Sequence, residues 1–281
     1  GTLETRKVYD SSIITKKKSL TLFNFFQNVI LGKGSSNSIL NAMPLARILS
    51  RRIDYNRIQD CLDNGSLHSL AITATSFHES MSTTFVQSNQ DYHWERVRRE
   101  GIVEKIKTKH LMASTAIPFL FAPVKIQSKY YGDGSLRNIA PFSPAIRSGA
   151  SNIVVIGVRE AEESNGTYNK EQISFGDIFS KVLNTILFDS LDVDYERMMR
   201  INETVSNNGH SLKLKKINSV LVRPSISISQ LAIEYEYEAP QILHHLMDML
   251  GSKNESSDLL SYLLFEPGYL SALIDQGYKD A

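Results

Sequence analysis

The sequence predicts an α/β fold with a mostly parallel central sheet and helices on both of its faces. Runs typical of strands alternate with segments of helical periodicity along much of the chain, which is the pattern of such folds. The run Ile153–Val158 is continuously apolar, as in a strand that is buried on both faces. With 281 residues, of which 42% are apolar, the chain can bury one substantial core.

The N-terminal segment combines a basic cluster with an amphipathic helix. Lys16–Lys18 precede the stretch SLTLFNFFQNVILGKG, in which apolar residues recur at helical spacing up to Gly32. Such a helix can lie on a membrane surface or pack on the sheet. Two short helices are predicted next, over Pro44–Ser50 and over Asn56–Leu62, the second of which ends at Asn64-Gly65.

A hairpin and a basic segment with one tryptophan follow. Ser69–Phe77 is predicted to be a buried strand, and Met81–Gln87 its hairpin partner. Asp91–Arg99 contains Trp94 and three arginines, which fits an anionic headgroup site because guanidinium groups bind phosphate well. A solvated face with one buried indole is the commoner explanation of such a segment. A helix is predicted over Val103–Ala116.

The strongest candidate for a functional side chain is Asp133, which lies between Gly132 and Gly134. It follows Val124–Tyr131, which is predicted to be extended, and precedes a loop with two prolines and a short helix. Glycines can adopt backbone conformations that are closed to other residues, and they leave space for another group to approach the carboxylate. On the residues alone, an Asp in such a turn more often caps it with its own side chain.

The C-terminal part of the chain is predicted to be mainly helical. A long helix over Phe175–Val205 carries a broad apolar stripe that is typical of core packing. Ile217–Val222, closed by Pro224, is the last predicted strand. Four further helices are expected at Ser229–Tyr235, Pro240–Leu250, Ser256–Phe265 and Pro267–Gln276.

Three stretches in the middle of the chain carry a resemblance to a known family. They read ASTAIPFLFAPV, YGDGS and PFSPAIRSGA, in that order. With them the sequence resembles the patatin-like phospholipase family, and bacterial members share the C-terminal SYLLFEPGYL and GYKDA as well. The resemblance implies a three-layer α/β/α fold. Residues 1–160 are then the C-terminal part of the α/β hydrolase domain, and residues 161–281 add a long helix, the last strand and a helical cap on the same domain.

The resemblance also implies a chemistry for the site. In that family the Asp of an Asp-Gly-Gly or Asp-Gly-Ala motif is the base of a Ser–Asp dyad that hydrolyses fatty-acyl esters. Asp133 is the matching residue, with Gly132, Gly134 and Ser135 around it, although most relatives have Gly or Ala at the position of Ser135. The substrate class is phospholipid or another fatty-acyl ester, and the family's reaction requires no cofactor.

The other half of the dyad is absent from these residues. No Gly-x-Ser-x-Gly turn occurs in the chain, because Gly34-Ser35-Ser36 is not followed by a glycine at position 38. We therefore expect the nucleophilic serine and a glycine-rich oxyanion loop upstream, in a longer polypeptide. The alternative is a catalytically inactive protein or fragment that binds a partner or a membrane surface. In either case an upstream fragment or a second subunit is expected to cover an exposed sheet edge.

Composition excludes several other classes of protein. Lys and Arg number 31 against 30 Asp and Glu, so bulk charge does not indicate a nucleic-acid partner. The seven histidines show no zinc-binding spacing, and we expect no metal site. The one cysteine, Cys61, excludes an internal disulfide. Together with the bacterial resemblance this favours a cytoplasmic protein that can associate with a membrane surface.

Overall fold

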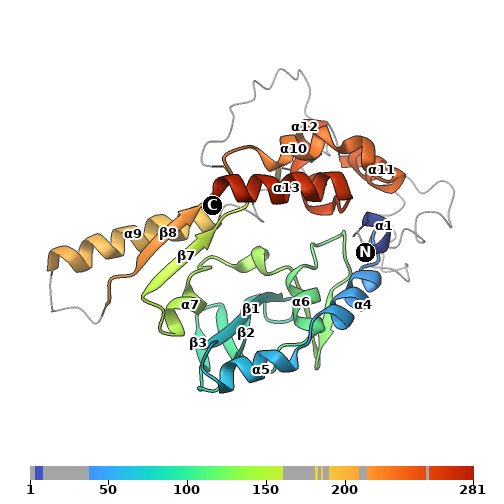
Figure 1. The fold of residues 1–281 in the computed structure, drawn as a ribbon. Coiled ribbons are helices and arrows are strands. Elements are labelled where there is room, and N and C mark those ends of the chain that lie inside the picture. The colour runs from blue at the N-terminus through green and yellow to red at the C-terminus, as the bar shows by residue number, and fades with distance from the viewer. Residues whose placement is uncertain are drawn as a thin grey trace.

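The computed structural model describes residues 4–8, 38–160, 181–182, 185, 190–208, 214–250 and 253–281 (Figure 1). The amphipathic helix predicted after Lys16–Lys18 lies outside these residues, as does much of the first half of the helix predicted over Phe175–Val205. Strands and helices alternate through the described residues, so the predicted α/β fold is confirmed.

Six strands form the larger sheet, in the order β3-β4-β2-β1-β6-β5. Their bounds are β1 Ser69–Ser76, β2 Met81–Ser88, β3 Trp94–Arg96, β4 Arg99–Val103, β5 Val124–Ile126 and β6 Lys129–Gly132. The predicted hairpin of the first two strands is confirmed. The strand directions of this sheet are mixed: β2 and β4 run parallel, and its other neighbouring pairs are antiparallel. Short hairpin turns account for three of these antiparallel pairs, β1–β2, β3–β4 and β5–β6, because such turns join only antiparallel strands.

The strand pairings align one row of residues across this sheet. Along the row, neighbours pair in the order Arg96, Arg99, Ser82, Thr75 and Gly132. Residues that pair directly point to the same face of a sheet. The row crosses four interstrand steps of ~4.8 Å, so its ends, Arg96 on β3 and Gly132 on β6, lie roughly 19 Å apart.

Helices cover both faces of the larger sheet. α4 (Met43–Arg52) and α5 (Asn56–Asp63) match the two predicted short helices. α6 (Thr108–Ser114) is shorter than expected, because the first residues of the predicted Val103–Ala116 belong to β4 and the loop after it. One face packs on α5 and α6 in a core that includes Phe85. The short α7 (Ser143–Arg147) lies on the other face.

A second sheet consists of the parallel strands β7 (Asn152–Ile156) and β8 (Asn218–Val222). One of its faces packs on α9 (Ser190–Asn208) through a buried core that includes Val155 and Met198. On the other face the side chains of Val154, Ile156 and Val220 are 71%, 75% and 60% exposed. The prediction that this apolar run is buried on both faces is therefore wrong. No described element covers its outer face, and sequence alone does not show which faces of a strand find a partner.

The C-terminal helices, drawn in orange and red in Figure 1, pack on one another and on the segments around residues 39–40 and 116–121. They are α10 (Ile228–Glu234), α11 (Gln241–Leu250), α12 (Lys253–Leu263) and α13 (Pro267–Asp280), which confirms the four predicted helices. They enclose the largest buried apolar cluster, which includes Leu260 and Tyr269. The N-terminal α1 (Thr5–Val8) joins this cluster, and the Thr5 hydroxyl accepts a hydrogen bond of 2.9 Å from the backbone N–H of Phe265.

Candidate functional site

Asp133 lies directly after β6, where the chain turns into the short 3-10 helix η1 (Gly134–Arg137). Its backbone N–H donates a hydrogen bond of 3.0 Å to the carbonyl oxygen of Ala116. Its carboxylate accepts a hydrogen bond of 2.8 Å from the backbone N–H of Ser135 and so caps η1. The interpretation of Asp133 as a turn cap is confirmed. The residue is only 7% exposed, so the carboxylate is both buried and fixed by the backbone around it.

Gly132 and Gly134 serve close packing rather than unusual backbone angles. Neither is among the described glycines with positive φ, so the expectation that they adopt conformations closed to other residues is wrong. A Cβ on Gly134 would overlap the carbonyl oxygen of Thr73 and lie 3.0 Å from its carbonyl carbon. A Cβ on Gly132 would lie 2.6 Å from the ring of Phe77. The space beside both glycines is thus filled by atoms of this chain.

Burial raises the pKa of Asp133 above its ordinary value, and burial is the largest influence on it. The backbone N–H and the hydroxyl of Ser135 act in the opposite direction, because they hydrogen-bond the charged form. The net direction remains upward. A carboxylate with a raised pKa binds a proton more strongly than an exposed one, and this improves its strength as a general base near neutral pH.

The tertiary structure places α12 close to this carboxylate, which the motif around residue 133 did not indicate. Burial raises the pKa of the Tyr262 phenol, and the charge of Asp133 adds to that shift. Asp258 of the same helix forms an ion pair of 3.3 Å with Arg159, and both charges also act on Tyr262. The stretch SYLLFEPGYL, which contains this tyrosine, carried the family resemblance but suggested no role for it.

A groove of about 910 Å³ lies on the sheet face that α7 covers. Its floor is the β1 side chains of Ser69, Ala71 and Thr73, and its wall includes α7, Tyr92 and the turn at Gly149. Beyond the two-residue pairing with β6, this edge of β1 pairs with no other described strand. The groove ends at Thr73, the residue whose carbonyl packs against Gly134. It therefore reaches the immediate surroundings of Asp133 from the unpaired edge of the sheet.

The scan against protein families decides the identity of this fold. A family model described as patatin-like phospholipase matches residues 6–146, which is 141 of the 281 residues. The chain belongs to the patatin-like phospholipase family. The matched segment contains the whole larger sheet and Asp133, so the predicted resemblance is confirmed. Patatin-like proteins are lipid acyl hydrolases in general. Searches of curated proteins and of solved structures gave no match.

The described part of the patatin-like chain offers neither a metal site nor a membrane-spanning helix. It contains no cluster of three or more His, Cys, Asp or Glu side chains able to hold a metal ion. No helix there has the length and apolar character needed to cross a bilayer. His110 is fully buried, and its ring stacks on Phe85 at 4.6 Å between centroids, so it contributes to the core behind the sheet.

We expect Asp133→Asn to stabilise the patatin-like fold at pH 7 by on the order of 0.5–2 kcal/mol. The folded-state pKa is raised above the ordinary 3.8, so the folded protein is most favoured below that pH and loses stability as pH rises through the folded pKa. Asn removes this charge but keeps the oxygen that caps η1. Urea unfolding at pH 7 and near pH 4 checks this. The increase in unfolding free energy caused by the substitution should be smaller near pH 4 than at pH 7. An equal increase at the two pH values would contradict the prediction.

Proposed function

We propose that this patatin-like chain is part of a serine acyl hydrolase that cleaves phospholipid or other fatty-acyl esters with a Ser–Asp dyad. The observation that carries the proposal is Asp133, a buried carboxylate with a raised pKa. The resemblance of its Gly-Asp-Gly motif to the family's motif supports its assignment as the catalytic Asp. As the base, it takes the proton of the attacking serine and returns it to the leaving alcohol. The serine and the donors that stabilise the oxyanion come from a segment outside these 281 residues.

The groove beside β1 supports a place for that segment. A strand that adds along the unpaired edge over Ser69–Thr73 would gain backbone hydrogen bonds from it. One end of such a strand would lie beside Thr73, which packs directly against Gly134. A serine at that end would come close to the carboxylate of Asp133. The segment is either an upstream part of the same polypeptide or a second subunit.

A second candidate function rests on a different observation. The outer face of β7 and β8 exposes Val154, Ile156 and Val220, and parallel sheets normally have both faces covered. This favours a protein that acts by binding a partner, in which the dyad is incomplete and the domain does no chemistry. The two candidates differ in one measurable property, which is the presence of an activated serine.

Labelling with a fluorophosphonate probe separates them. The natural polypeptide that contains this chain is treated with the probe, and the labelled peptide is identified by mass spectrometry. The hydrolase proposal predicts one labelled serine, located in a Gly-x-Ser-x-Gly segment outside residues 1–281, and slower labelling of the Asp133→Asn variant. Heat-denatured protein serves as the control for nonspecific reaction.

Two results would contradict the hydrolase. If the natural polypeptide is folded but takes up no probe, the result favours the second candidate, a protein that acts by binding a partner. A label on a serine within this chain, such as Ser135, would show that the nucleophile has been assigned to the wrong segment. Asp194→Asn is a matched control, because Asp194 is also 7% exposed and also accepts a backbone hydrogen bond, from Phe142 at 3.2 Å. It should label as fast as the unchanged protein.

A further inference from the structure

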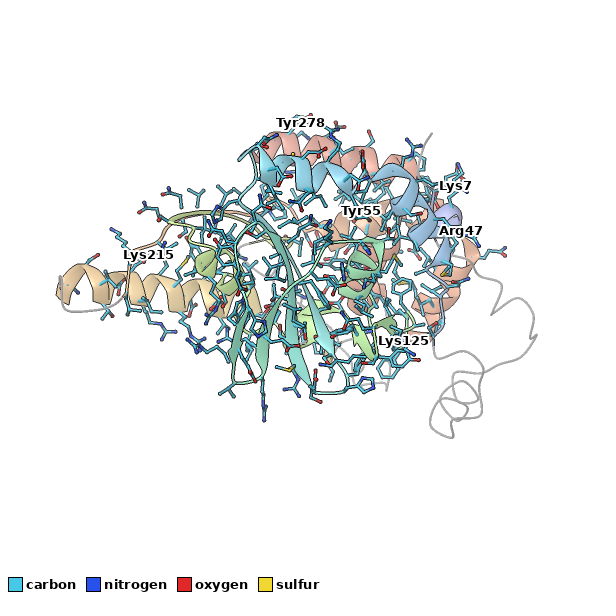
Figure 2. All side chains as sticks on the ribbon, turned by 90° about the horizontal axis from the view of Figure 1, so that it is seen from below. Lys7, Arg47, Tyr55, Lys125, Lys215 and Tyr278 are labelled. Carbon is cyan, nitrogen blue, oxygen red and sulfur yellow. The ribbon has the colours of Figure 1, made fainter. Side chains whose placement is uncertain are left out.

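Three hairpin turns meet at one end of the larger sheet. They are residues 77–80 between β1 and β2, 97–98 between β3 and β4, and 127–128 between β5 and β6. The register places them together, because β4 begins beside the start of β2, and β6 begins beside the end of β1. In Figure 2, Lys125 lies toward the lower end of the sheet, on the side of these turns. We call this region, comprising residues 77–80, 96–99 and 125–130, the hairpin surface.

Direct contacts hold the hairpin surface together. The backbone N–H of Ser82 donates a hydrogen bond of 2.9 Å to the carbonyl oxygen of Arg98. The backbone N–H of Tyr130 donates to His78 Nδ1 at 3.2 Å, and the two rings stack with centroids 6.0 Å apart. Lys129 forms an ion pair with Glu79 across the same junction. The three turns are therefore one continuous surface rather than three independent loops.

The charge of this surface is predominantly positive. It contains five cationic side chains and one carboxylate, Glu79, which Lys129 already pairs, while the carboxylates of Glu95 and Glu100 flank the β3–β4 turn. The other four cations are Arg96, Arg98, Arg99 and Lys125, and none of them forms an ion pair with a described carboxylate. Arg96 and Arg99 also pair directly across β3 and β4, a position in which like charges repel. Such a surface is complementary to an anionic partner.

A further cation that forms no ion pair with a described carboxylate lies beside this surface. Arg147 of α7 stacks over the Trp94 ring, with its guanidinium carbon 4.6 Å from the ring centroid. Burial lowers the pKa of Arg147, and the neighbouring charges of Arg96 and Arg99 lower it further. The tertiary structure thus gathers guanidinium groups from two separate parts of the chain on one face, which raises the positive potential there.

Apolar side chains project from the same surface. Val97, at the tip of the β3–β4 turn, is 87% exposed, more than any other large apolar side chain in the described residues. Phe77 and Tyr130 on the neighbouring turns are 44% and 45% exposed, and the Lys125 ammonium lies 5.9 Å from the centre of the Tyr130 ring. Aliphatic and aromatic groups surrounded by Lys and Arg are typical of surfaces that enter the headgroup region of a bilayer.

Each of the three turns contains one residue with a left-handed backbone. Ser80, Arg98 and Gln127 have φ of 51°, 58° and 54°, and each lies in a different one of the turns. Tight hairpin turns require such angles, and a residue other than glycine adopts them at a small conformational cost. At Arg98 the strained position holds a cation where glycine would fit better.

We propose that the hairpin surface docks the protein on a bilayer of anionic phospholipid. The arginines and Lys125 bind headgroup phosphates, while Val97 enters the interface between them. The row from Arg96 to Gly132 is roughly 19 Å long, and its Gly132 end lies on β6 next to Tyr130 of the hairpin surface, so docking brings the region of Asp133 near the bilayer. Docking needs no hydrolysis, so this proposal can fail or hold independently of the Ser–Asp dyad.

The test is co-sedimentation of the full chain with vesicles of phosphatidylcholine that contain phosphatidylglycerol. Arg96→Gln/Arg98→Gln/Lys125→Gln should weaken binding roughly 100-fold, because each basic residue near an anionic membrane contributes strongly to attraction. Val97→Ser should weaken it further by removing the apolar tip. Arg98→Gly separates loss of binding from loss of folding, because glycine adopts the left-handed backbone of residue 98 easily. Its melting temperature should stay equal or rise, while its binding to vesicles should fall about 5-fold.

The matched control is Arg51→Gln/Arg52→Gln/Arg57→Gln, which changes the net charge equally at exposed positions of α4 and α5. It should bind vesicles like the unchanged protein, and vesicles of phosphatidylcholine alone should bind none of these proteins. Equal loss in the control and the hairpin variant would overturn the proposal, as would displacement from vesicles by millimolar inorganic phosphate. A third result would also overturn it: unchanged binding of the hairpin variant while Lys16→Gln/Lys17→Gln/Lys18→Gln abolishes binding.

Discussion

Asp133→Asn should lower ester hydrolysis by the natural polypeptide by about 10²–10⁴-fold, which is the usual contribution of a positioned general base. Asn has the same shape as Asp and can still accept the hydrogen bond from the Ser135 backbone, so the turn should keep its geometry. It cannot accept the serine proton. The measurement is turnover of a nitrophenyl ester, expressed per mole of folded protein. A urea unfolding curve of each variant gives the folded fraction.

Asp194→Asn is the control for this experiment. Asp194 of α9 is as little exposed as Asp133, and burial raises the pKa of its carboxyl as well. Its carboxylate, however, accepts a hydrogen bond from the backbone N–H of Phe142 and does not lie at the Asp133 turn. Turnover by this variant should stay within about 2-fold of the unchanged protein, as is usual away from the reacting groups. If Asp133→Asn retained near-normal turnover, the dyad would have to be abandoned.

Gly134→Ala should cost both stability and activity. The added Cβ would overlap the carbonyl oxygen of Thr73, a backbone atom inside the hairpin of β1 and β2, which cannot move without disturbing the sheet. Overpacking of this kind costs about 1–3 kcal/mol in the free energy of unfolding. The neighbouring carboxylate should shift with the turn, and a misplacement of ~1 Å can reduce turnover about 100-fold. Urea unfolding and ester turnover measure the two effects.

Gly132→Ala is the matched comparison on the other side of Asp133. Its Cβ would meet the ring of Phe77 at 2.6 Å, but that ring is 44% exposed and can rotate away. We expect a change in unfolding free energy of under about 1 kcal/mol. If the two alanine variants were equally stable and equally active, contact with the Thr73 backbone would not be what positions Asp133.

Much of the fold follows from local patterns. The hairpin of β1 and β2, the helices α4 and α5 and the four C-terminal helices lie close to where periodicity, proline and glycine predicted them. Val124–Tyr131 was expected to be one extended segment, yet it folds into the hairpin of β5 and β6 around Gln127. That turn contains no glycine or asparagine, so the local sequence did not predict a hairpin there.

The candidate site was likewise predicted in part by a local motif and in part depends on tertiary contacts. The motif around Asp133 identified the carboxylate, and the family match agrees with that segment. Its burial, the close packing of Gly134 on Thr73 and the proximity of Tyr262 depend on contacts with β1 and α12, which are distant in sequence. No pattern of spacing encodes such contacts, because they arise only when the elements pack.

The sequence by itself determined the α/β class and the patatin-like family and singled out Asp133 as the candidate acid, because each is carried by local periodicity or by a contiguous motif. Only the tertiary structure decided that no described element covers one face of β7, and that three hairpin turns meet so that the cations of two of them lie on one surface. Both depend on which strands become neighbours. That choice is made by the free energy of packing distant segments, which no single stretch of residues contains.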